Sequence, residues 1–331
     1  MTPAKILFSV MLCAVTAGCI SRPPGATRIA LTSGDPAFLN EIANDRDVPN
    51  QKVTGSFFEP MSEGGRFPAI VILHTSFGQG AQDWHYAKIF LEWGYAVFAV
   101  DSFTARGVKT TLNDQTTVSE AAMIEDAYAA LNYLATRADI DPARIVVLGF
   151  SKGGSAAIFG SLARYRDRLA KGDNRFAAHI AYYPWCGVHY LHPRTTGAPM
   201  LILDGADDDV TPPALCAELE REFRAANPSV RIQRIVYPGA KHAFDHPLLS
   251  LPLASAIAKP GLVPTHCAIR EVSDNDFVED YSGLTLNRET ITAAVRACST
   301  TGASIAANPD AAKQALEAVR RFLGEVLDDP R

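Results

Sequence analysis

Residues 144–157 read Arg-Ile-Val-Val-Leu-Gly-Phe-Ser-Lys-Gly-Gly-Ser-Ala-Ala, and they carry the strongest indication of the fold. A β-branched run ends at Gly-x-Ser-x-Gly, and small residues follow that would let a helix begin directly against a sheet. The pattern predicts a strand, a sharp turn and a helix. Gly149 and Gly153 would leave clearance for a strained residue between them, so the side chain of Ser151 should stand clear of the backbone.

Ser151 then has two interpretations. It is a nucleophile at a helix N-terminus, where the helix dipole and the backbone N–H of Lys152 would favour a developing oxyanion. Alternatively, it is the N-cap of an ordinary helix that follows a strand. The motif alone does not separate the two, because a short motif needs its structural context.

Composition bounds the class of protein. The chain has 331 residues, of which 47% are hydrophobic and 20% charged, which is enough for one large buried core. The formal net charge of −5 provides no basic surface for nucleic acid, so nucleic acid is not an expected partner.

The N-terminus predicts export. Lys5 precedes an apolar run over 6–15 that is too short to span a membrane, and Thr-Ala-Gly-Cys follows at 16–19. Residues 1–18 resemble a bacterial lipoprotein signal peptide, which would leave Cys19 lipidated and the protein tethered to a membrane. Thr16 departs from the usual leucine of that signal, and plain secretion is the alternative.

Four further cysteines predict two disulfides, because an even number in an exported chain favours pairing. Three pairings are open, as is a set of four buried thiols. We expect Cys186 to pair with Cys216 and Cys267 with Cys298, since each pair falls within one region of the fold predicted next.

Apolar runs alternate with helical patterns along the chain, which is typical of a parallel sheet. Strands are expected at 51–58, 67–74, 95–101, 144–150, 177–183, 199–203 and 231–237, and helices at 84–93, 119–135, 213–226 and 309–326. The prediction is an α/β-hydrolase fold, with a mostly parallel sheet flanked by helices on both faces. Residues 19–50 are expected to be a tether and lead-in, and residues 51–331 a single domain with an insertion at about 248–307 that could cap the site.

Two loops after neighbouring strands supply partners for Ser151. Residues 204–212 read Asp-Gly-Ala-Asp-Asp-Asp-Val-Thr-Pro, and residues 238–244 read Pro-Gly-Ala-Lys-His-Ala-Phe. Both loops should emerge at the carboxyl ends of parallel strands, where α/β sheets bind ligands. The chain order Ser, Asp, His is that of α/β-hydrolases.

On these motifs the chain resembles the dienelactone hydrolase family. The matching stretches are Ile72-Leu73-His74 with Phe77-Gly78, Asp101-Ser102-Phe103 with Arg106-Gly107, Gly149 to Gly154, Gly205-Ala206-Asp207-Asp208 with Thr211-Pro212, and Lys241 to Phe244. Their order along the chain is more specific than any single one of them.

The resemblance implies a role for each catalytic position. Ser151 corresponds to the nucleophile, His242 to the general base and Asp208, three residues after the family's glycine, to the orienting acid. Asp207 and Asp209 are the alternatives for the acid.

The oxyanion hole would pair the backbone N–H of Lys152 with that of Ser76, and the Lys152 ammonium is expected to be solvated. Founding members of the family resemble this chain but have a cysteine nucleophile and a glutamate in the oxyanion loop. Here Ser151 and Thr75 stand at those positions, so a dienelactone substrate is not expected.

Aromatic residues near strand ends, with one arginine, are candidates for binding substrate. They are Phe77, Trp84, Phe103, Arg106, Tyr183, Trp185 and Phe244. The alternative for the aromatic residues is packing in the core, and for Arg106 an ion pair with a structural acid. His189 and His192 lack convincing zinc spacing, and neither a metal nor another cofactor is expected.

Together these features predict an exported serine hydrolase that cleaves a small-molecule carboxylic ester through an acyl-enzyme. A peptidase or thioesterase on the same triad is an alternative. So is a non-catalytic envelope lipoprotein with this fold, although such a protein would have no reason to keep all three triad residues. The sequence leaves the oligomeric state open.

Overall fold

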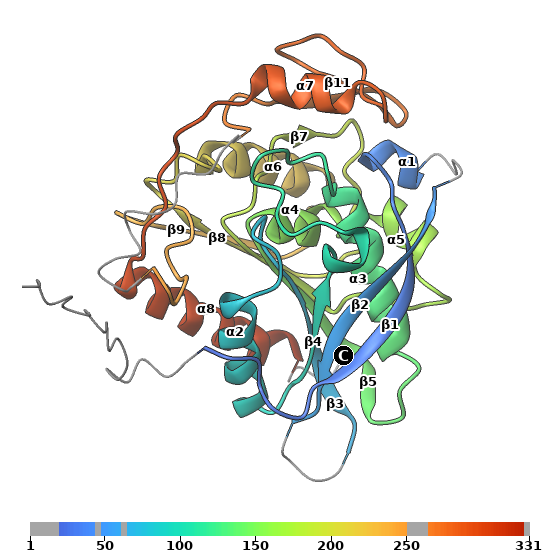
Figure 1. Ribbon diagram of the computed structural model, residues 1–331, viewed down its shortest axis with the longest axis vertical. Coiled ribbons are helices and arrows are strands. Elements are labelled where there is room, and N and C mark those ends of the chain that lie inside the picture. The colour runs from blue at the N-terminus through green and yellow to red at the C-terminus, as the bar shows by residue number, and fades with distance from the viewer. Residues whose placement is uncertain (1–19, 44–47, 61–64, 250–263, 328–331) are drawn as a thin grey trace, which may run out of the picture.

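The computed structural model describes residues 20–43, 48–60, 65–249 and 264–327 (Figure 1). The predicted signal peptide, its lipidation site Cys19 and residues 250–263 of the predicted insertion lie outside these ranges. None of the helices in the described ranges is long and apolar enough to cross a membrane.

An eight-stranded sheet forms the centre of the molecule, in the order β1-β2-β4-β3-β5-β6-β8-β9. The pairings β1–β2 and β2–β4 are antiparallel. Every pairing from β4–β3 to β8–β9 is parallel. The strands are β1 (Thr27–Gly34), β2 (Asn50–Phe58), β3 (Phe67–Leu73), β4 (Ala96–Asp101), β5 (Ile140–Phe150), β6 (Ala178–Tyr182), β8 (Met200–Gly205) and β9 (Ile232–Tyr237). The predicted mostly parallel α/β sheet is confirmed.

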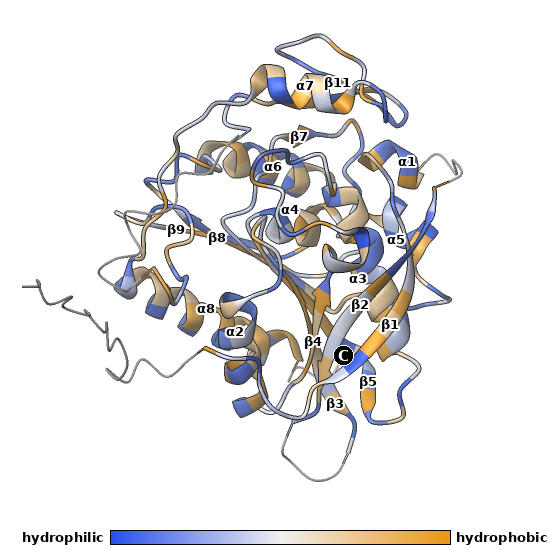
Figure 2. Cartoon of the chain, viewed as in Figure 1, coloured by the Kyte–Doolittle hydropathy of each residue, from blue (hydrophilic) through white to orange (hydrophobic). Residues whose placement is uncertain are grey.

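Helices cover both faces of this sheet. The helices are α1 (Leu39–Ala43), α2 (Ala81–Glu92), the 3-10 turn η1 (Thr104–Arg106), α3 (Glu120–Leu134), α4 (Lys152–Phe159), α5 (Ala163–Leu169), α6 (Pro213–Ala226), α7 (Ile291–Cys298) and α8 (Pro309–Leu327). One core packs α2 and α8 against the sheet, and a second core packs α3, α4 and α6 against the opposite face. Figure 2 shows hydrophobic residues concentrated in the central strands between these layers.

Strand β3 shows how one strand supplies both cores. Ala69, Val71 and Leu73 face the core that contains α3 and α4, whereas Ile70 and Ile72 face the core that contains α2 and α8. Successive side chains of a strand point to opposite faces, so a strand covered on both sides must be apolar at every position. This is why apolar and polar residues do not alternate along this strand.

Part of the predicted tether and lead-in at 19–50 forms regular structure, which corrects that prediction. Residues 27–34 form β1, an edge strand that pairs with β2, and residues 39–43 form α1. The burial of β1 alternates along only part of its length because one face remains in solvent. A half-exposed edge strand leaves a weaker pattern than the continuous apolar runs of the central strands.

The insertion builds a small sheet over one end of the molecule (Figure 1). Its strands β10 (Ile269–Ser273) and β11 (Asp276–Glu279) join β7 (Val188–His189). Both predicted disulfides are confirmed, with Cys186 bonded to Cys216 and Cys267 to Cys298. The first bond ties the segment before β7 to α6, and the second ties α7 to the segment before β10.

Candidate active site

Ser151 lies at the junction of β5 and α4 in a strained conformation, with φ 52° and ψ −116°. A Cβ atom on Gly149 would lie 2.0 Å from the Gly153 carbonyl oxygen, and one on Gly153 would lie 2.3 Å from the Leu73 carbonyl oxygen. Both glycines are therefore required by close backbone approach, as the motif predicts. Positive φ at a non-glycine residue is stored strain, which is common at functional sites.

The Ser151 side chain does not cap helix α4. Its Oγ lies 2.9 Å from Nε2 of His242 instead. The N-cap interpretation is thus wrong for the side chain, although Ser151 occupies the N-cap position of the helix.

His242 also contacts the predicted acid, with its Nδ1 atom 2.8 Å from Oδ2 of Asp208. A carboxylate only accepts hydrogen bonds, so Nδ1 carries the proton and Nε2 is left to accept one from the Ser151 hydroxyl. Ser151, His242 and Asp208 are each less than a tenth exposed. The structure therefore brings the three residues into a buried, directional chain.

Asp208 is held by the turn that follows β8. Its Oδ1 accepts hydrogen bonds from the backbone N–H groups of Val210 and Thr211, at 2.9 and 2.8 Å, and its Oδ2 accepts one from the Thr211 hydroxyl at 2.9 Å. Asp207 and Asp209 are exposed, and Asp209 accepts hydrogen bonds from Ser304. Of the three adjacent aspartates, only Asp208 reaches the histidine.

The loop after β3 packs directly against the turn between β5 and α4 that carries Ser151. His74 is fully buried, its Nδ1 lies 2.8 Å from the Thr75 carbonyl, and its Nε2 accepts from the N–H of Ser102 at 3.2 Å. Burial lowers the His74 pKa, so its ring is neutral and orients the loop as a donor and an acceptor at once. Within the described chain, the backbone N–H groups of Ser76 and Lys152 donate to no protein acceptor.

A cavity of about 380 Å³ opens in front of Ser151 and His242. Of the candidate substrate contacts, Phe77, Tyr183 and Trp185 line it. The insertion contributes Pro264 and Ile305, and Leu248 and Leu249 precede the undescribed residues 250–263. The predicted capping position of the insertion is consistent with this lining.

Trp84, Phe103, Arg106 and Phe244 do not line the cavity, which corrects their assignment as substrate-binding candidates. Phe103 and Phe244 are almost fully buried, Phe103 edge-on to His74 and Phe244 among the tyrosines of the α2–α8 core. Trp84 packs against Phe58 and under Arg22. For these aromatic residues the core-packing interpretation holds.

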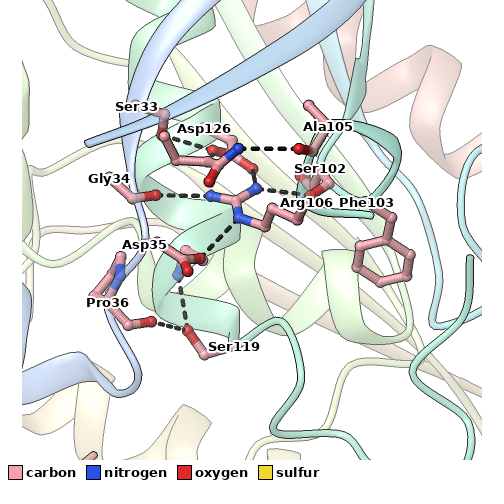
Figure 3. A network of polar contacts seen from close by, with 12 residues as sticks. Ser33, Gly34, Asp35, Pro36, Ser102, Phe103, Ala105, Arg106, Ser119 and Asp126 are labelled. Atoms are coloured by element: carbon pink, nitrogen blue, oxygen red, sulfur yellow. Dashed lines mark hydrogen bonds and ion pairs between the residues drawn. The ribbon is translucent and has the colours of Figure 1, made fainter. Parts of the chain in front are cut away.

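Arg106 lies in a structural network instead (Figure 3). Its guanidinium donates to Asp126 at 2.7 Å, to Asp35 at 2.8 Å and to the carbonyls of Gly34 and Ser102 at 2.7 Å. Asp126 is fully buried and also accepts from Ser33. The arginine thus joins β1 to η1 and α3.

The expected solvated state of Lys152 is wrong. Its side chain is 2% exposed, and its Nζ lies 2.9 Å from Oε1 of Glu120 and donates to the Gln115 carbonyl at 2.8 Å. The Gln115 side chain in turn accepts from Ser76 Oγ at 2.8 Å. Gln115 and Glu120 were not predicted, because only the fold brings them to residues 32 or more positions away.

A second network that was not predicted reaches His242 through the ring of Tyr183. The buried carboxylate of Asp245 accepts hydrogen bonds from Tyr183, Tyr86 and Gln82, at 2.7, 2.7 and 3.1 Å. The ring of Tyr183 packs edge-on against the His242 ring, with centroids 4.7 Å apart. Asp245 follows His242 by three positions in the sequence, which is the only signal that could have indicated it.

His189, one of the two histidines considered for a metal site, pairs with Glu222 at 2.7 Å. Among the described residues, no group of three or more His, Cys, Asp or Glu side chains is arranged to hold a metal ion.

Comparisons with known proteins identify the family. The dienelactone hydrolase family model matches residues 53–258. A protein from Methylorubrum extorquens, named as a candidate carboxymethylenebutenolidase, is 28% identical over 221 residues, which cover 61% of this chain and 72% of the relative. An uncharacterised protein from Mycobacterium tuberculosis is 26% identical over 200 residues, which cover 57% of this chain and 67% of the relative.

Solved structures support the fold. A protein named m3DLH superposes with a TM-score of 0.57 at 18% identity and covers 91% of this chain and 98% of its own. A dienelactone hydrolase-like promiscuous phosphotriesterase from metagenomic libraries does so with a TM-score of 0.53 at 16% identity, with the same coverage of both chains. Because the family match spans more than half of the chain, the protein belongs to the dienelactone hydrolase family and is a hydrolase that acts on carboxylic ester bonds.

Proposed function

We propose that the protein is a serine esterase in which Ser151 is acylated, His242 is the general base and Asp208 orients the base. The observation that carries this proposal is the hydrogen-bonded chain from Asp208 through His242 to Ser151, with both distances below 3.0 Å. It lies at the edge of a cavity large enough for a small ester.

In the first step, the Ser151 hydroxyl attacks the ester carbonyl while His242 Nε2 takes its proton. The tetrahedral intermediate collapses, and His242 gives that proton to the departing alcohol. Water then attacks the acyl-serine with His242 again as base, which releases the acid and restores the serine. A serine hydroxyl is far from ionised at neutral pH, so it depends on this base more than a thiol would.

The negative charge that develops on the carbonyl oxygen needs donors in place beforehand. The backbone N–H groups of Lys152 and Ser76 are the proposed oxyanion hole, since both residues line the cavity with Ser151 and these N–H groups have no acceptor in the described chain. Packing of Gly153 against the Leu73 and His74 carbonyls keeps the two donors together.

Replacing His242 by alanine tests the assignment. We expect the variant to fold and to lose p-nitrophenyl ester turnover by a factor on the order of 10³ or more. A variant that retained turnover would identify another base. Lys241→Ala is the matched control, because this neighbouring side chain contacts Ser304 and does not line the cavity.

We also propose that the protein is exported and anchored by a lipid on Cys19. Two disulfides support an oxidising compartment. Metabolic labelling with a palmitate analogue in a bacterial host should mark the wild type and leave Cys19→Ala unmarked. Equal labelling of both proteins, or of neither, would reject the anchor.

A further inference from the structure

The cavity in front of Ser151 has one permanent cation among the lining residues that the structure describes, which is Lys152. The remaining ionisable groups of that lining are Asp83, Glu120, Tyr183, His242 and His246. Any recognition of an anionic substrate by a charged group of the described lining would therefore depend on Lys152.

Lys152 is not available for that purpose, because Glu120 neutralises it. The ammonium lies 2.9 Å from the Glu120 carboxylate, and the two side chains are 2% and 26% exposed. A second N–H of the ammonium donates to the Gln115 carbonyl. A buried cation held by a carboxylate and a carbonyl has little attraction left for a further anion.

The other groups do not replace it. Asp83 accepts from the Gly80 N–H at 2.7 Å, and burial raises its pKa to about 7, so it is either neutral or repels an anion. Burial lowers the pKa of His246, which keeps that ring uncharged at neutral pH.

The rest of the cavity wall is predominantly apolar. Phe77, Leu112, Trp185, Leu248, Leu249 and Ile305 line it. Phe77 and Leu248 are 51% and 42% exposed, so apolar surface continues out toward solvent. A carboxylate that entered such a cavity would lose hydration without gaining a free cationic partner among the described lining residues, which is unfavourable.

We propose that the site selects uncharged esters with apolar acyl or alcohol groups, and that Glu120 determines this specificity by neutralising Lys152. The inference rests on the proposed esterase function of Ser151 and narrows its substrate class. It makes Glu120 a specificity-determining residue, because the charge that it cancels is the one that would otherwise hold an anionic substrate.

Two substrates that differ in charge and by one methyl group test the substrate class. Mono-p-nitrophenyl adipate carries a terminal carboxylate, and its ω-methyl ester does not. We expect kcat/KM of the wild type to be about 100-fold higher for the methyl ester, as an unpaired carboxylate requires. A ratio below about tenfold overturns the proposal.

Glu120→Gln tests the residue. It should leave Lys152 unpaired, so that the ratio of kcat/KM, methyl ester over carboxylate, falls by about tenfold or more. Glu120→Gln/Lys152→Met removes the cation as well and is expected to restore the preference for the methyl ester. An unchanged ratio in the single variant, or one that stays low in the double variant, contradicts the role of Glu120. Because the ratio is taken within one preparation, partial loss of folded protein cancels.

Fluorophosphonate labelling of the same preparations distinguishes a failure of the esterase function from a failure of the substrate inference alone. If the wild type neither labels nor hydrolyses either ester, the esterase function fails and the inference with it. If it labels and hydrolyses both esters at similar rates, the function stands and the inference alone fails. If Glu120→Gln does not fold, Lys152→Met is the test. This variant leaves the Glu120 carboxylate without its cation, so the ratio of kcat/KM, methyl ester over carboxylate, should rise above that of the wild type. An unchanged or lower ratio would contradict the proposal.

Discussion

The Tyr183 hydroxyl donates a 2.7 Å hydrogen bond to the buried carboxylate of Asp245, while its ring packs edge-on against His242. Tyr183 itself has a positive φ of 38°, and its hydroxyl also accepts from Gln82 at 2.6 Å. Hydrogen bonds thus fix the tyrosine hydroxyl, and the tyrosine ring in turn fixes the position of the His242 ring.

Tyr183→Phe removes the hydroxyl but keeps the ring. We expect the free energy of unfolding to fall by about 1–3 kcal/mol, because buried Asp245 loses a donor and Gln82 an acceptor. Ester turnover should fall less than in Tyr183→Ala, which also removes the ring behind His242. Urea denaturation and kcat measure the two effects. A phenylalanine variant as stable as the wild type would contradict the account.

Asp208→Asn distinguishes the three adjacent aspartates. An amide at this position favours the wrong tautomer of His242, so kcat should fall by a factor on the order of 10³ to 10⁴ with little change in KM. The matched control is Asp207→Asn, whose exposed side chain lies one residue away. If the Asp207 variant lost as much activity as the Asp208 variant, the acid would be wrongly assigned.

The order of the triad could be predicted, because parallel strands end at one edge of the sheet and Ser151, Asp208 and His242 each follow such a strand. The disulfide partners followed from the same reasoning. By contrast, the burial of Lys152 could not be predicted. A lysine at this position in the sequence gives no sign that it is buried. Glu120 comes close to it only because α3 packs against α4.

The aromatic candidates show another limit. Phe77 and Trp185 line the cavity while Phe103 and Phe244 are in the core, although all four lie near strand ends. Which way a loop side chain turns depends on the neighbours that the fold supplies. Edge strand β1 was missed for a related reason, because half of its surface faces solvent and its apolar pattern is short.

Arg106→Met tests the structural role of the arginine. Removing the cation leaves Asp126 buried without its ion-pair partner, which should lower the free energy of unfolding by about 3–5 kcal/mol. The KM for a neutral ester should remain that of the wild type. Arg231→Met is the control, because its pair with Glu325 is about half exposed and should contribute less than about 1 kcal/mol. A raised KM at normal stability would instead indicate substrate binding.

The pKa of Asp83 predicts how stability depends on pH. Burial raises this pKa from its ordinary value of 3.8 to about 7, so the folded state keeps a proton that the unfolded state loses. Stability from this group is therefore full below about pH 4 and is lost as the pH rises through about 7.

Chemical denaturation of Asp83→Asn and wild type at several pH values checks this. The wild type should lose up to about 4 kcal/mol relative to the variant between about pH 4 and pH 8. Glu125 and Asp204, whose pKa values burial also raises to about 7, are present in both proteins and cancel in the comparison. Parallel stability curves would show that Asp83 ionises normally.

Mass spectrometry of the protein after reaction with a fluorophosphonate identifies the nucleophile directly. We expect one adduct, on Ser151, in the wild type. We expect no adduct on this peptide in Ser151→Ala and much slower labelling in His242→Ala. Labelling at another serine, or equal labelling of wild type and Ser151→Ala, would contradict the assignment of Ser151 as the nucleophile.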